Sequence, residues 1–547
     1  MPARKGQGQW ALGYHEPLNP NERSKRDNDG LKVRQRIEDI YQHTGFAGID
    51  PADLRGRFRW YGLYTQRRQG IPGGKTATLE PEELEDEFFM MRIRIDGGAL
   101  TSEQLQVVAD IATTYGRDLA DITDRQNVQL HWIRIEDVPK IWAKLEAVGL
   151  STTEACGDTP RVMLGCPVEG VAADSVLDAS AALRITVDRF LGDPAFSNLP
   201  RKYKTSISGC ASHCTNHEIN DISFVGVLGP DGTAGFDLWV GGGLSTNPRF
   251  AERLGAFVRP DEVPEVWAGV TSVFRDYGYR RQRNHARLKF LMADWGPVKF
   301  REVLESEYLH RALPDGPPPP ASPAHRDHTG LIPQADGRIA VGATTRSGRT
   351  SGTVLAELAT LADRYGSGRI RLTTQQGLVV LDVAAEQADR LADELALHDL
   401  FVRPSAFLRG TIACTGIEFC KLALVETKLR ADTIRLELEK RLPDFDTPIT
   451  LNVNGCPNSC ARFQDADIGF KGMVQKGPNG DEDAFQVHLG GQMGTEAEFG
   501  RKFRGLKVTA EQAPDYAERV LRGFLARRTD GESFAAYVSR AEEEWLL

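Results

Sequence analysis

The hydrophobic and polar positions of the chain form one pattern that occurs twice, about 250 residues apart. In the first copy, strict alternation over 91–95 predicts a strand. A possible capping box of Thr101 and Gln104, followed by apolar residues at helical spacing, predicts a helix. A second strand is predicted over 127–133 and a second helix over 138–148, with proline in its first turn. This order indicates an α+β sandwich, whose two copies could share one sheet.

Particular residues also recur in the same order, at an offset that drifts slowly from 250 to 246. An ordered series of this kind indicates a duplicated chain with pseudo-twofold symmetry. The pairs that carry it are Tyr115 and Tyr365, Gln126 and Gln376, Arg161 and Arg409, Cys166 and Cys414, Cys210 and Cys456, and Cys214 and Cys460.

The repeat and a proline-rich stretch divide the chain into segments. Pro317–Pro320 marks the clearest linker, and it lies between the two copies. We expect an N-terminal wrapping segment (1–85), a central domain of two repeated half-domains (86–155 plus 335–405), a first cofactor- and substrate-binding domain (156–311), a linker (312–334), and a second domain with four clustered cysteines (406–547).

Composition excludes several classes of protein. Of the 547 residues, 41% are hydrophobic and 26% are charged, which is an ordinary globular balance. The net charge of −9 argues against a nucleic-acid partner. The chain has no apolar run of about 18 residues, so we expect no membrane association. Because its start lacks the apolar stretch of a signal peptide, we expect a cytoplasmic protein. Residues 1–70 carry 13 basic and 8 acidic residues, so this leader could meet an acidic partner or simply wrap the body.

Eight cysteines in a long chain without a signal peptide indicate metal or redox chemistry, because disulfide frameworks belong to small secreted domains. Cys414 and Cys420 form C-x5-C, and Cys456 and Cys460 form C-x3-C. Two such pairs suit either a [4Fe–4S] cluster or tetrahedral zinc. Zinc turns more often use other spacings, and the glycine and proline around Cys456 favour a tight loop at a cluster.

The remaining cysteines lie in the first copy. Cys166, Cys210 and Cys214 correspond to three of the four clustered cysteines, but the counterpart of Cys420 is Ala172. A second cluster would therefore need a ligand from elsewhere, and thiols left over from the duplication are the simpler interpretation. Cys156 has no apparent partner, and we expect a small buried residue there.

One predicted strand face is polar and cationic. Asn127, Gln129 and His131 share this face, with Arg125 just before it, and Arg92 and Arg94 share a face of the neighbouring strand. The second copy, residues 378–381, is apolar on both faces. The first copy is either a solvated strand face or a buried site for an anion.

Several motifs then resemble one family, the sirohaem-dependent nitrite and sulfite reductases. The cysteine motifs at 415–427 and 452–462 are the most specific part of this resemblance, which covers most of residues 50–500. It continues through 53–60, 123–127, 200–204 and 239–244. The resemblance implies a three-domain pseudo-twofold architecture, with ferredoxin-like half-domains and mixed sheets around the cofactor.

The resemblance also implies roles for individual residues. Cys414, Cys420, Cys456 and Cys460 would hold one [4Fe–4S] cluster, and Cys460 would bridge it to the sirohaem iron. Sirohaem is ringed by carboxylates, so its pocket needs cationic and polar donors. The cofactor-binding residues would be Arg57, Arg59, Arg94, Arg125, Asn127, Gln129 and His131. The catalytic residues around a small anionic substrate would be Arg92, Arg161, Lys202 and Lys204.

The implied activity is the six-electron reduction of sulfite to sulfide. Family members specialised for nitrite tend to have asparagine at the position of Lys204, which favours sulfite, with ferredoxin–nitrite reductase as the alternative. No segment remains for a flavin or nicotinamide domain, so ferredoxin is the expected electron donor, and we expect a monomer. A zinc-stapled binding protein without catalysis is the distant alternative, which the colour of the protein would exclude.

Overall fold

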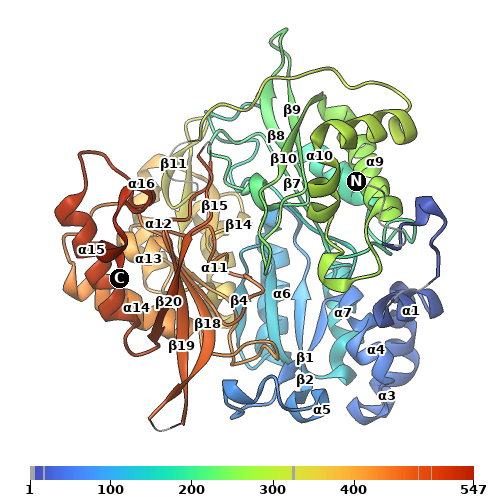
Figure 1. Ribbon diagram of the computed structural model, residues 1–547, viewed down its shortest axis with the longest axis horizontal. Helices are drawn as coiled ribbons and strands as arrows, with labels where there is room; N and C mark the ends of the chain where they lie inside the picture. Colours follow the sequence, from blue (N-terminus) through green and yellow to red (C-terminus); the bar gives the residue numbers. More distant parts are fainter. Residues whose placement is uncertain (1–6, 17–18, 323–326, 479, 495) are drawn as a thin grey trace.

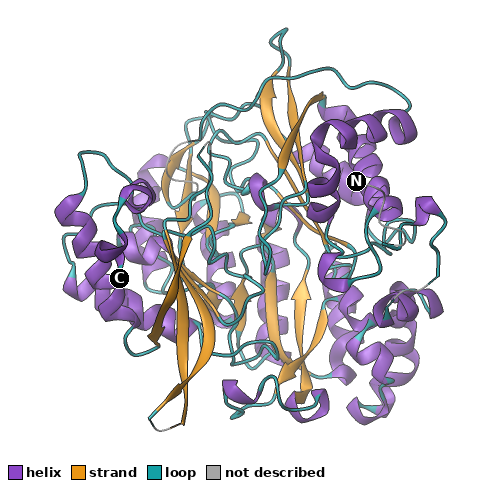
Figure 2. Cartoon of the chain, in the orientation of Figure 1, coloured by secondary structure: helices purple, strands orange, loops and turns teal. Residues whose placement is uncertain are grey.

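The computed structural model describes residues 7–16, 19–322, 327–478, 480–494 and 496–547. Strands lie in the interior and helices cover much of the outside (Figure 2). Residues 406–547 occupy the left of Figure 1, and residues 156–311 occupy its upper right. None of the described helices is both long enough and apolar enough to span a bilayer.

Two five-stranded sheets with equivalent helices form the centre of the protein. The first sheet has the order β1 (Leu63–Arg67), β2 (Glu85–Ile93), β5 (Val128–Ile133), β4 (Ala120–Ile122), β13 (Arg349–Thr350). The second has the order β11 (Gly330–Pro333), β12 (Ile339–Ala343), β15 (Leu378–Val383), β14 (Arg369–Leu372), β3 (Ala99–Thr101). The helices are α6 (Ser102–Tyr115) and α7 (Val138–Ala147) in the first half, and α11 (Gly352–Tyr365) and α12 (Ala388–Ala396) in the second. Thr101 and Gln104 do form the capping box that begins α6.

The expectation that both copies share one sheet is wrong. Each half has its own antiparallel sheet and contributes one short strand to the other. β13 of the second half pairs with β4, and β3 of the first half pairs with β14. These strands are two and three residues long, so hydrophobic alternation could not reveal them.

One hydrophobic core joins the two halves. Leu105 and Ile111 of α6 belong to the same buried cluster as Leu358 of α11. The two helices approach closely at Gly352, where an added Cβ would lie 2.7 Å from the carbonyl oxygen of Ala109. The half-domains are therefore packed as one unit, and their relative orientation is fixed by burial.

The two outer domains share a second topology. The first has the sheet order β10 (Glu252–Val258), β9 (Ala234–Val240), β8 (Ile222–Leu228), β7 (Tyr203–Ser208), β6 (Pro160–Leu164), with α8 (Ser180–Phe190), α9 (Val263–Tyr277) and α10 (Leu288–Val303). The second has β16 (Thr411–Ala413), β17 (Leu451–Asn454), β18 (Ile468–Gly477), β19 (Gly480–Leu489), β20 (Arg501–Thr509), with α13 (Ala406–Gly410), α14 (Lys428–Arg441), α15 (Ala513–Arg527), α16 (Phe534–Arg540) and α17 (Glu543–Leu546). In each sheet the first three strands along the chain are parallel and the last two are antiparallel.

The N-terminal segment wraps the lower right of the body in Figure 1. Its short helices are α1 (Pro20–Asp27), α2 (Val33–Arg36), α3 (Gln42–Thr44), α4 (Pro51–Arg55) and α5 (Pro81–Leu84). Many of its cations are paired at short range: Arg36 and Arg57 with Asp53, and Lys25 with Glu22 and Asp158. The structure thus favours the wrapping arm over a docking surface for an acidic partner.

Candidate active site

The four clustered cysteines meet at the carboxyl end of two parallel strands. Cys414 directly follows β16, and Cys456 follows β17 after one glycine. Because β16 and β17 are parallel neighbours, their carboxyl ends lie at the same edge of the sheet. The backbone N–H of Gly455 donates to Cys414 Sγ over 3.2 Å, which is the type of contact that stabilises thiolates at a cluster.

The loop that carries Cys420 is held against the N-terminal segment. Arg67 donates its backbone N–H to Phe419 and Thr76 donates its hydroxyl to Ala423, both at 2.9 Å. Burial raises the pKa of Cys414 to about 12, so a proton stays on this thiol until a metal displaces it. The loop therefore holds Cys420 close enough to Cys414, Cys456 and Cys460 for these groups to influence one another.

The polar face of β5 lies beside this cluster loop. Arg92 Nη2 donates to Gln129 Oε1 over 2.9 Å, and Gln129 Nε2 donates to Thr415 Oγ1 over 3.1 Å. Gln129 thus links a cation of β2 to the residue next to Cys414. Although burial works against the charge of Arg92, the neighbouring Cys156, Tyr64 and Cys460 raise its pKa.

Lys202 and Lys204 lie half-buried in the same region. Neither ammonium group forms an ion pair or a side-chain hydrogen bond with the described part of the chain. Burial lowers the pKa of Lys204 to about 7, and the charges of Arg125 and Arg287 act in the same direction. Burial and the charge of Lys204 lower the pKa of Lys202, while Cys460 raises it. Half-buried cations without an ion pair are more stable when an anion binds between them.

Three further arginines predicted from the sequence surround this group. Arg161 donates to the carbonyl oxygen of Gly157, and Arg125 donates to Asn220 and to the carbonyl oxygen of Val162. The buried Nε groups of Arg92 and Arg125 have no hydrogen-bond partner. The guanidinium of Arg59 lies over the ring of Tyr64 and makes no hydrogen bond with a described residue. Each of these cations keeps donor capacity for a bound anion.

Two predicted cofactor ligands are engaged within the protein. All five N–H groups of Arg94 are used: it pairs with Asp96 and donates to backbone carbonyls at residues 154, 160 and 161. Arg57 pairs with Asp53 and donates to the carbonyl oxygens of residues 24 and 28. All donors of Arg94 are therefore used within the protein, whereas Arg57 keeps two N–H groups, and the role of either side chain in binding a cofactor stays a prediction.

Asn127 and His131 act on the surroundings of the site. Asn127 Oδ1 accepts the backbone N–H of Ile95, which fixes the end of β2. His131 Nε2 lies 2.9 Å from Asp121 Oδ2, and its ring stacks on Phe419 with 3.8 Å between centroids. His131 therefore positions the loop that carries Cys420.

Sequence analysis did not predict that Cys156 and Tyr64 lie beside Arg92. Cys156 is buried and unpaired with another cysteine, as expected, but its Sγ lies 2.9 Å from Arg92 Nη1, and its thiol is hydrogen-bonded to Tyr64. Although burial opposes it, the charges of Arg92 and Arg161 lower the pKa of Cys156. Sequence analysis also missed Arg287, which forms two hydrogen bonds of 3.0 and 2.9 Å to the buried Asp221. In the sequence, the only sign of a cation near Cys156 is Arg161, five residues further along the chain.

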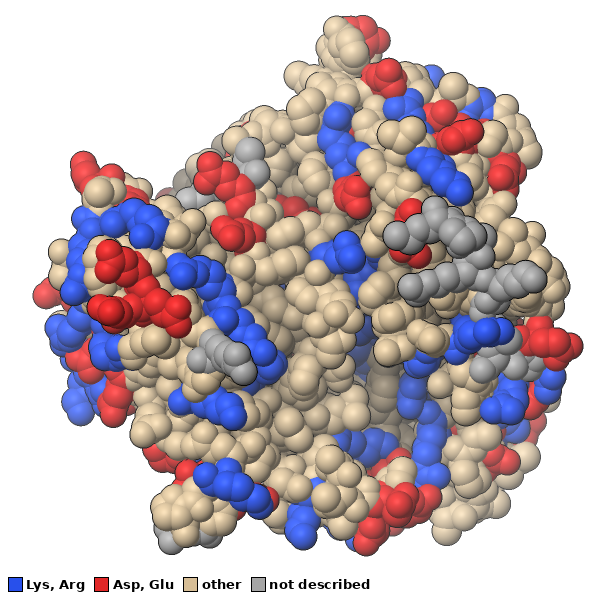
Figure 3. Space-filling view, in the orientation of Figure 1, with Lys and Arg blue, Asp and Glu red and all other residues tan. Residues whose placement is uncertain are grey.

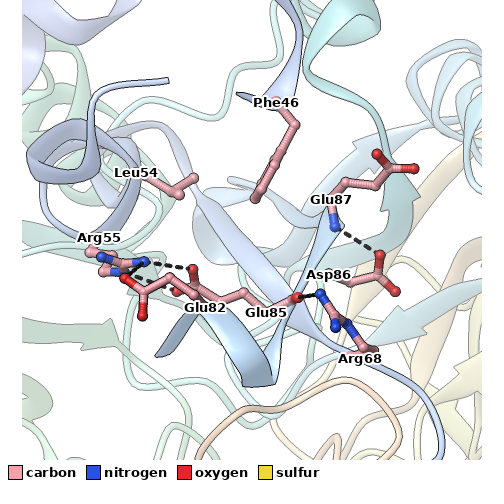
Figure 4. Close-up of a pocket in the computed structure, with 8 residues that line it drawn as sticks. All are labelled: Phe46, Leu54, Arg55, Arg68, Glu82, Glu85, Asp86 and Glu87. Atoms are coloured by element: carbon pink, nitrogen blue, oxygen red, sulfur yellow. Dashed lines mark hydrogen bonds and ion pairs between the residues drawn. The ribbon is translucent and has the colours of Figure 1, made fainter. Parts of the chain in front are cut away.

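A hollow near the middle of one face is lined by basic side chains, between the two sides of the molecule (Figure 3). A separate surface pocket of about 350 Å³ lies between the N-terminal segment and β2 (Figure 4). Its lining is mainly acidic, and Arg55 already pairs with Glu82 and Glu85 there. That pocket would repel an anion, so the group of cations around Lys202 and Lys204 is the candidate site.

Two family models match most of the chain, each of them twice. The nitrite and sulphite reductase 4Fe-4S domain matches residues 156–313 and 405–547. The nitrite/sulfite reductase ferredoxin-like half domain matches residues 82–148 and 332–398. The chain therefore belongs to the nitrite and sulphite reductase family, and the 4Fe-4S domain supports an iron–sulfur cofactor.

Relatives that match over nearly the full length of the chain are named as sulfite or nitrite reductases. The chain is 55% identical to a protein named sulfite reductase [ferredoxin] from Mycobacterium tuberculosis, over 99% of this chain and 98% of the relative. It is 36% identical to an assimilatory ferredoxin-dependent nitrite reductase from Haloferax mediterranei, over 94% of this chain and 91% of the relative. The solved structure of the Mycobacterium tuberculosis NirA protein has a TM-score of 0.97 at 55% identity, covering 99% of this chain and 100% of that one.

Proposed function

We propose that the protein is a ferredoxin-dependent sulfite reductase, which reduces sulfite to sulfide with six electrons at a sirohaem coupled to one [4Fe–4S] cluster. The cluster ligands in this proposal are Cys414, Cys420, Cys456 and Cys460. Support comes from the family match, from the full-length relatives named sulfite reductase, and from the geometry of the cations around Lys202 and Lys204.

The observation that carries the proposal is a group of half-buried cations that form no ion pair with a described residue, and of these Arg92 and Lys202 interact with Cys460. Lys202 and Lys204 have no anionic partner among the described residues, and the Nε groups of Arg92 and Arg125 are buried and unpaired. A cofactor ringed by carboxylates and an anionic substrate would supply the missing acceptors. Arg59 and Arg125 are the cations that we assign to the cofactor carboxylates, with Gln129 between Arg92 and the cluster loop.

When bound, a sirohaem would bind the substrate at its iron and pass electrons to it from the cluster. The protein residues supply charge and protons. Arg92, Arg161, Lys202 and Lys204 form a preorganised cationic surface that binds the anion and stabilises the charge on its oxygens. Lys204, whose pKa is lowered to about 7, is suited to donate protons near neutral pH as each oxygen leaves as water, and the pKa of Lys202 is lowered as well.

Lys204 also supports sulfite as the substrate. An ammonium at this position adds a second cation beside Lys202, and sulfite offers more oxygen atoms to bind and protonate than nitrite does. The nitrite reductases among the relatives keep reduction of nitrite to ammonia as the alternative on the same site. Ferredoxin is the proposed donor because the names of both groups of relatives include it.

The proposal is tested with the purified protein and reduced ferredoxin under anaerobic conditions. We expect an intense visible spectrum, and one sulfide produced for every six ferredoxins oxidised with sulfite as substrate. A colourless protein would exclude the proposed reductase activity. Saturation at a lower concentration of nitrite than of sulfite, together with faster turnover, would favour nitrite as the substrate.

A further inference from the structure

Three cysteines that the reductase chemistry leaves unused converge on one histidine. One ligand atom from each of Cys166, Cys210, Cys214 and His328 lies within 4.8 Å of all the others. His328 Nε2 is 3.3 Å from Cys166 Sγ and 3.6 Å from Cys210 Sγ. The three cysteines are buried and the histidine is half-buried.

The spacing of these atoms fits a single ion. Zinc bonds of about 2.3 Å to sulfur and about 2.0–2.1 Å to nitrogen place tetrahedral ligand atoms roughly 3.6–3.8 Å apart. A four-iron cubane spreads its cysteine sulfurs farther, because each one binds a different iron. Among the described residues no other group of three or more Cys, His, Asp or Glu meets the 4.8 Å spacing, so the cysteines at 414–460 are more widely separated.

The backbone around these cysteines repeats the scaffold of the cluster cysteines. Cys166 and Cys210 follow the parallel strands β6 and β7, as Cys414 and Cys456 follow β16 and β17. The turns after the second cysteine also match. His213 and Ser459 have φ of 50° and 56°, and Asn216 and Arg462 have φ of 51° and 53°. The fold thus presents the same cysteine-bearing loops twice.

Ala172 stands where a fourth cysteine would be expected from the repeat. His328, in the linker between the halves, takes the place of that cysteine. Arg409 holds this segment by two hydrogen bonds of 2.8 and 2.7 Å to Asp327, and by a third of 3.2 Å to the carbonyl oxygen of Thr329. The backbone of His328 lies directly against β12, since an added Cβ at Gly342 would lie 1.7 Å from its carbonyl oxygen. The histidine is therefore anchored on both sides.

The surroundings suit a small ion and exclude a large cofactor. Cys166, Cys210 and Cys214 pack in one hydrophobic cluster with Val379 and Leu381 of β15. These two residues occupy the positions that Gln129 and His131 hold in the first copy. Apolar side chains close the space in the second copy, where the first copy presents polar donors.

We propose that Cys166, Cys210, Cys214 and His328 bind one structural Zn²⁺ in tetrahedral Cys3His coordination. Zinc prefers thiolate and imidazole ligands in a closed four-coordinate site, and its binding displaces the thiol protons. The ion ties the linker between the halves to the loops after β6 and β7. This site is separate from the iron centres and does not take part in the reduction.

The test uses the purified full-length holoenzyme, expressed in medium with ordinary trace zinc. Elemental analysis should find one zinc per chain, in addition to the iron of the cluster and the sirohaem. X-ray absorption at the zinc edge should show three sulfur ligands at about 2.3 Å and one nitrogen at about 2.0–2.1 Å, with no interference from iron. Zinc-free enzyme with full iron content, additional iron bound by these cysteines, or a disulfide between two of them would overturn the proposal.

Paired variants separate this site from the cluster. Cys210→Ser and His328→Ala should lose most of the zinc and keep the iron and the visible spectrum, whereas Cys420→Ser should lose cluster iron and keep the zinc. His43→Ala, at an exposed histidine of α3, is the matched control and should keep both metals. Zinc retained at full stoichiometry in both Cys210→Ser and His328→Ala would contradict the assignment, and the measurement on the unaltered enzyme decides the matter if these variants do not fold.

Discussion

Gln126 and Gln376 make the same pair of hydrogen bonds in the two halves of the molecule. Gln126 donates to the carbonyl oxygen of Gly165 and accepts its N–H, and Gln376 does the same with Ala413. Both glutamines have a left-handed backbone, with φ of 55° and 59°. Each one fastens a central half-domain to the strand end that leads into a cysteine loop.

This equivalence predicts similar losses of stability in two distant variants. Gln126→Ala and Gln376→Ala each leave a buried N–H and a buried carbonyl group without a partner, which should cost roughly 1–3 kcal/mol. Gln106→Ala, at an exposed position of α6, should change the free energy of unfolding by less than about 0.5 kcal/mol. Chemical denaturation measures all three, and a neutral result for one buried glutamine would show that the halves are not equivalent there.

Arg94 is predicted to stabilise the fold without binding a cofactor. Its side chain is almost fully buried and pairs with Asp96 at 2.7 Å, so Arg94→Met should cost roughly 3–5 kcal/mol. Thermal unfolding should detect this loss, while the sirohaem absorbance of the folded fraction stays unchanged. Arg134→Met, which removes an exposed arginine, is the control. A loss of cofactor from a normally stable Arg94→Met protein would restore Arg94 as a cofactor ligand.

Lys204 should make turnover depend on pH near neutrality. Its pKa is lowered to about 7, so the ammonium donor is present below that pH and is lost as the pH rises through it. Lys204→Arg keeps the charge over this range, so the ratio of wild-type to variant turnover should fall from pH 6 to pH 8. The ratio cancels the titration of the substrate itself. If the pH profiles of the wild type and of Lys204→Arg ran in parallel, the proton donor would be another group. The carboxylates of a bound cofactor would raise the pKa of Lys204 and so move the midpoint of the profile to higher pH.

The cluster assignment predicts a loss of iron from one cysteine variant. Cys420→Ser removes one of four thiolate ligands, so cluster iron and its absorbance should disappear while the fold is retained. Far-ultraviolet circular dichroism checks the fold, and iron analysis measures the loss. Unchanged iron content in Cys420→Ser would remove this cysteine from the ligand set.

The sequence predicted the features that depend on local or repeated pattern. The capping box at Thr101, the duplication and the family resemblance needed only neighbouring residues or a fixed offset. The exchange of β3 and β13 was missed, because strands of two or three residues carry no periodicity. The hydrogen bonds that Arg57 and Arg94 form within the protein were not predicted either, since a long side chain finds its acceptors on segments that the sequence does not place nearby. The meeting of His328 with Cys166 depends on the path of a linker in the same way.

The comparison of unaltered enzyme with Lys204→Asn tests the central claim most directly. This claim is that the cations around Lys202 and Lys204 bind sulfite for its reduction. Steady-state turnover is measured with reduced ferredoxin, once with sulfite and once with nitrite, on samples of matched cofactor content. Removing one preorganised donor should lower sulfite turnover by about 10²–10³ and nitrite turnover by less. Equal losses for both anions at full cofactor content would contradict sulfite as the preferred substrate, and unchanged sulfite turnover would contradict the assignment of the site itself.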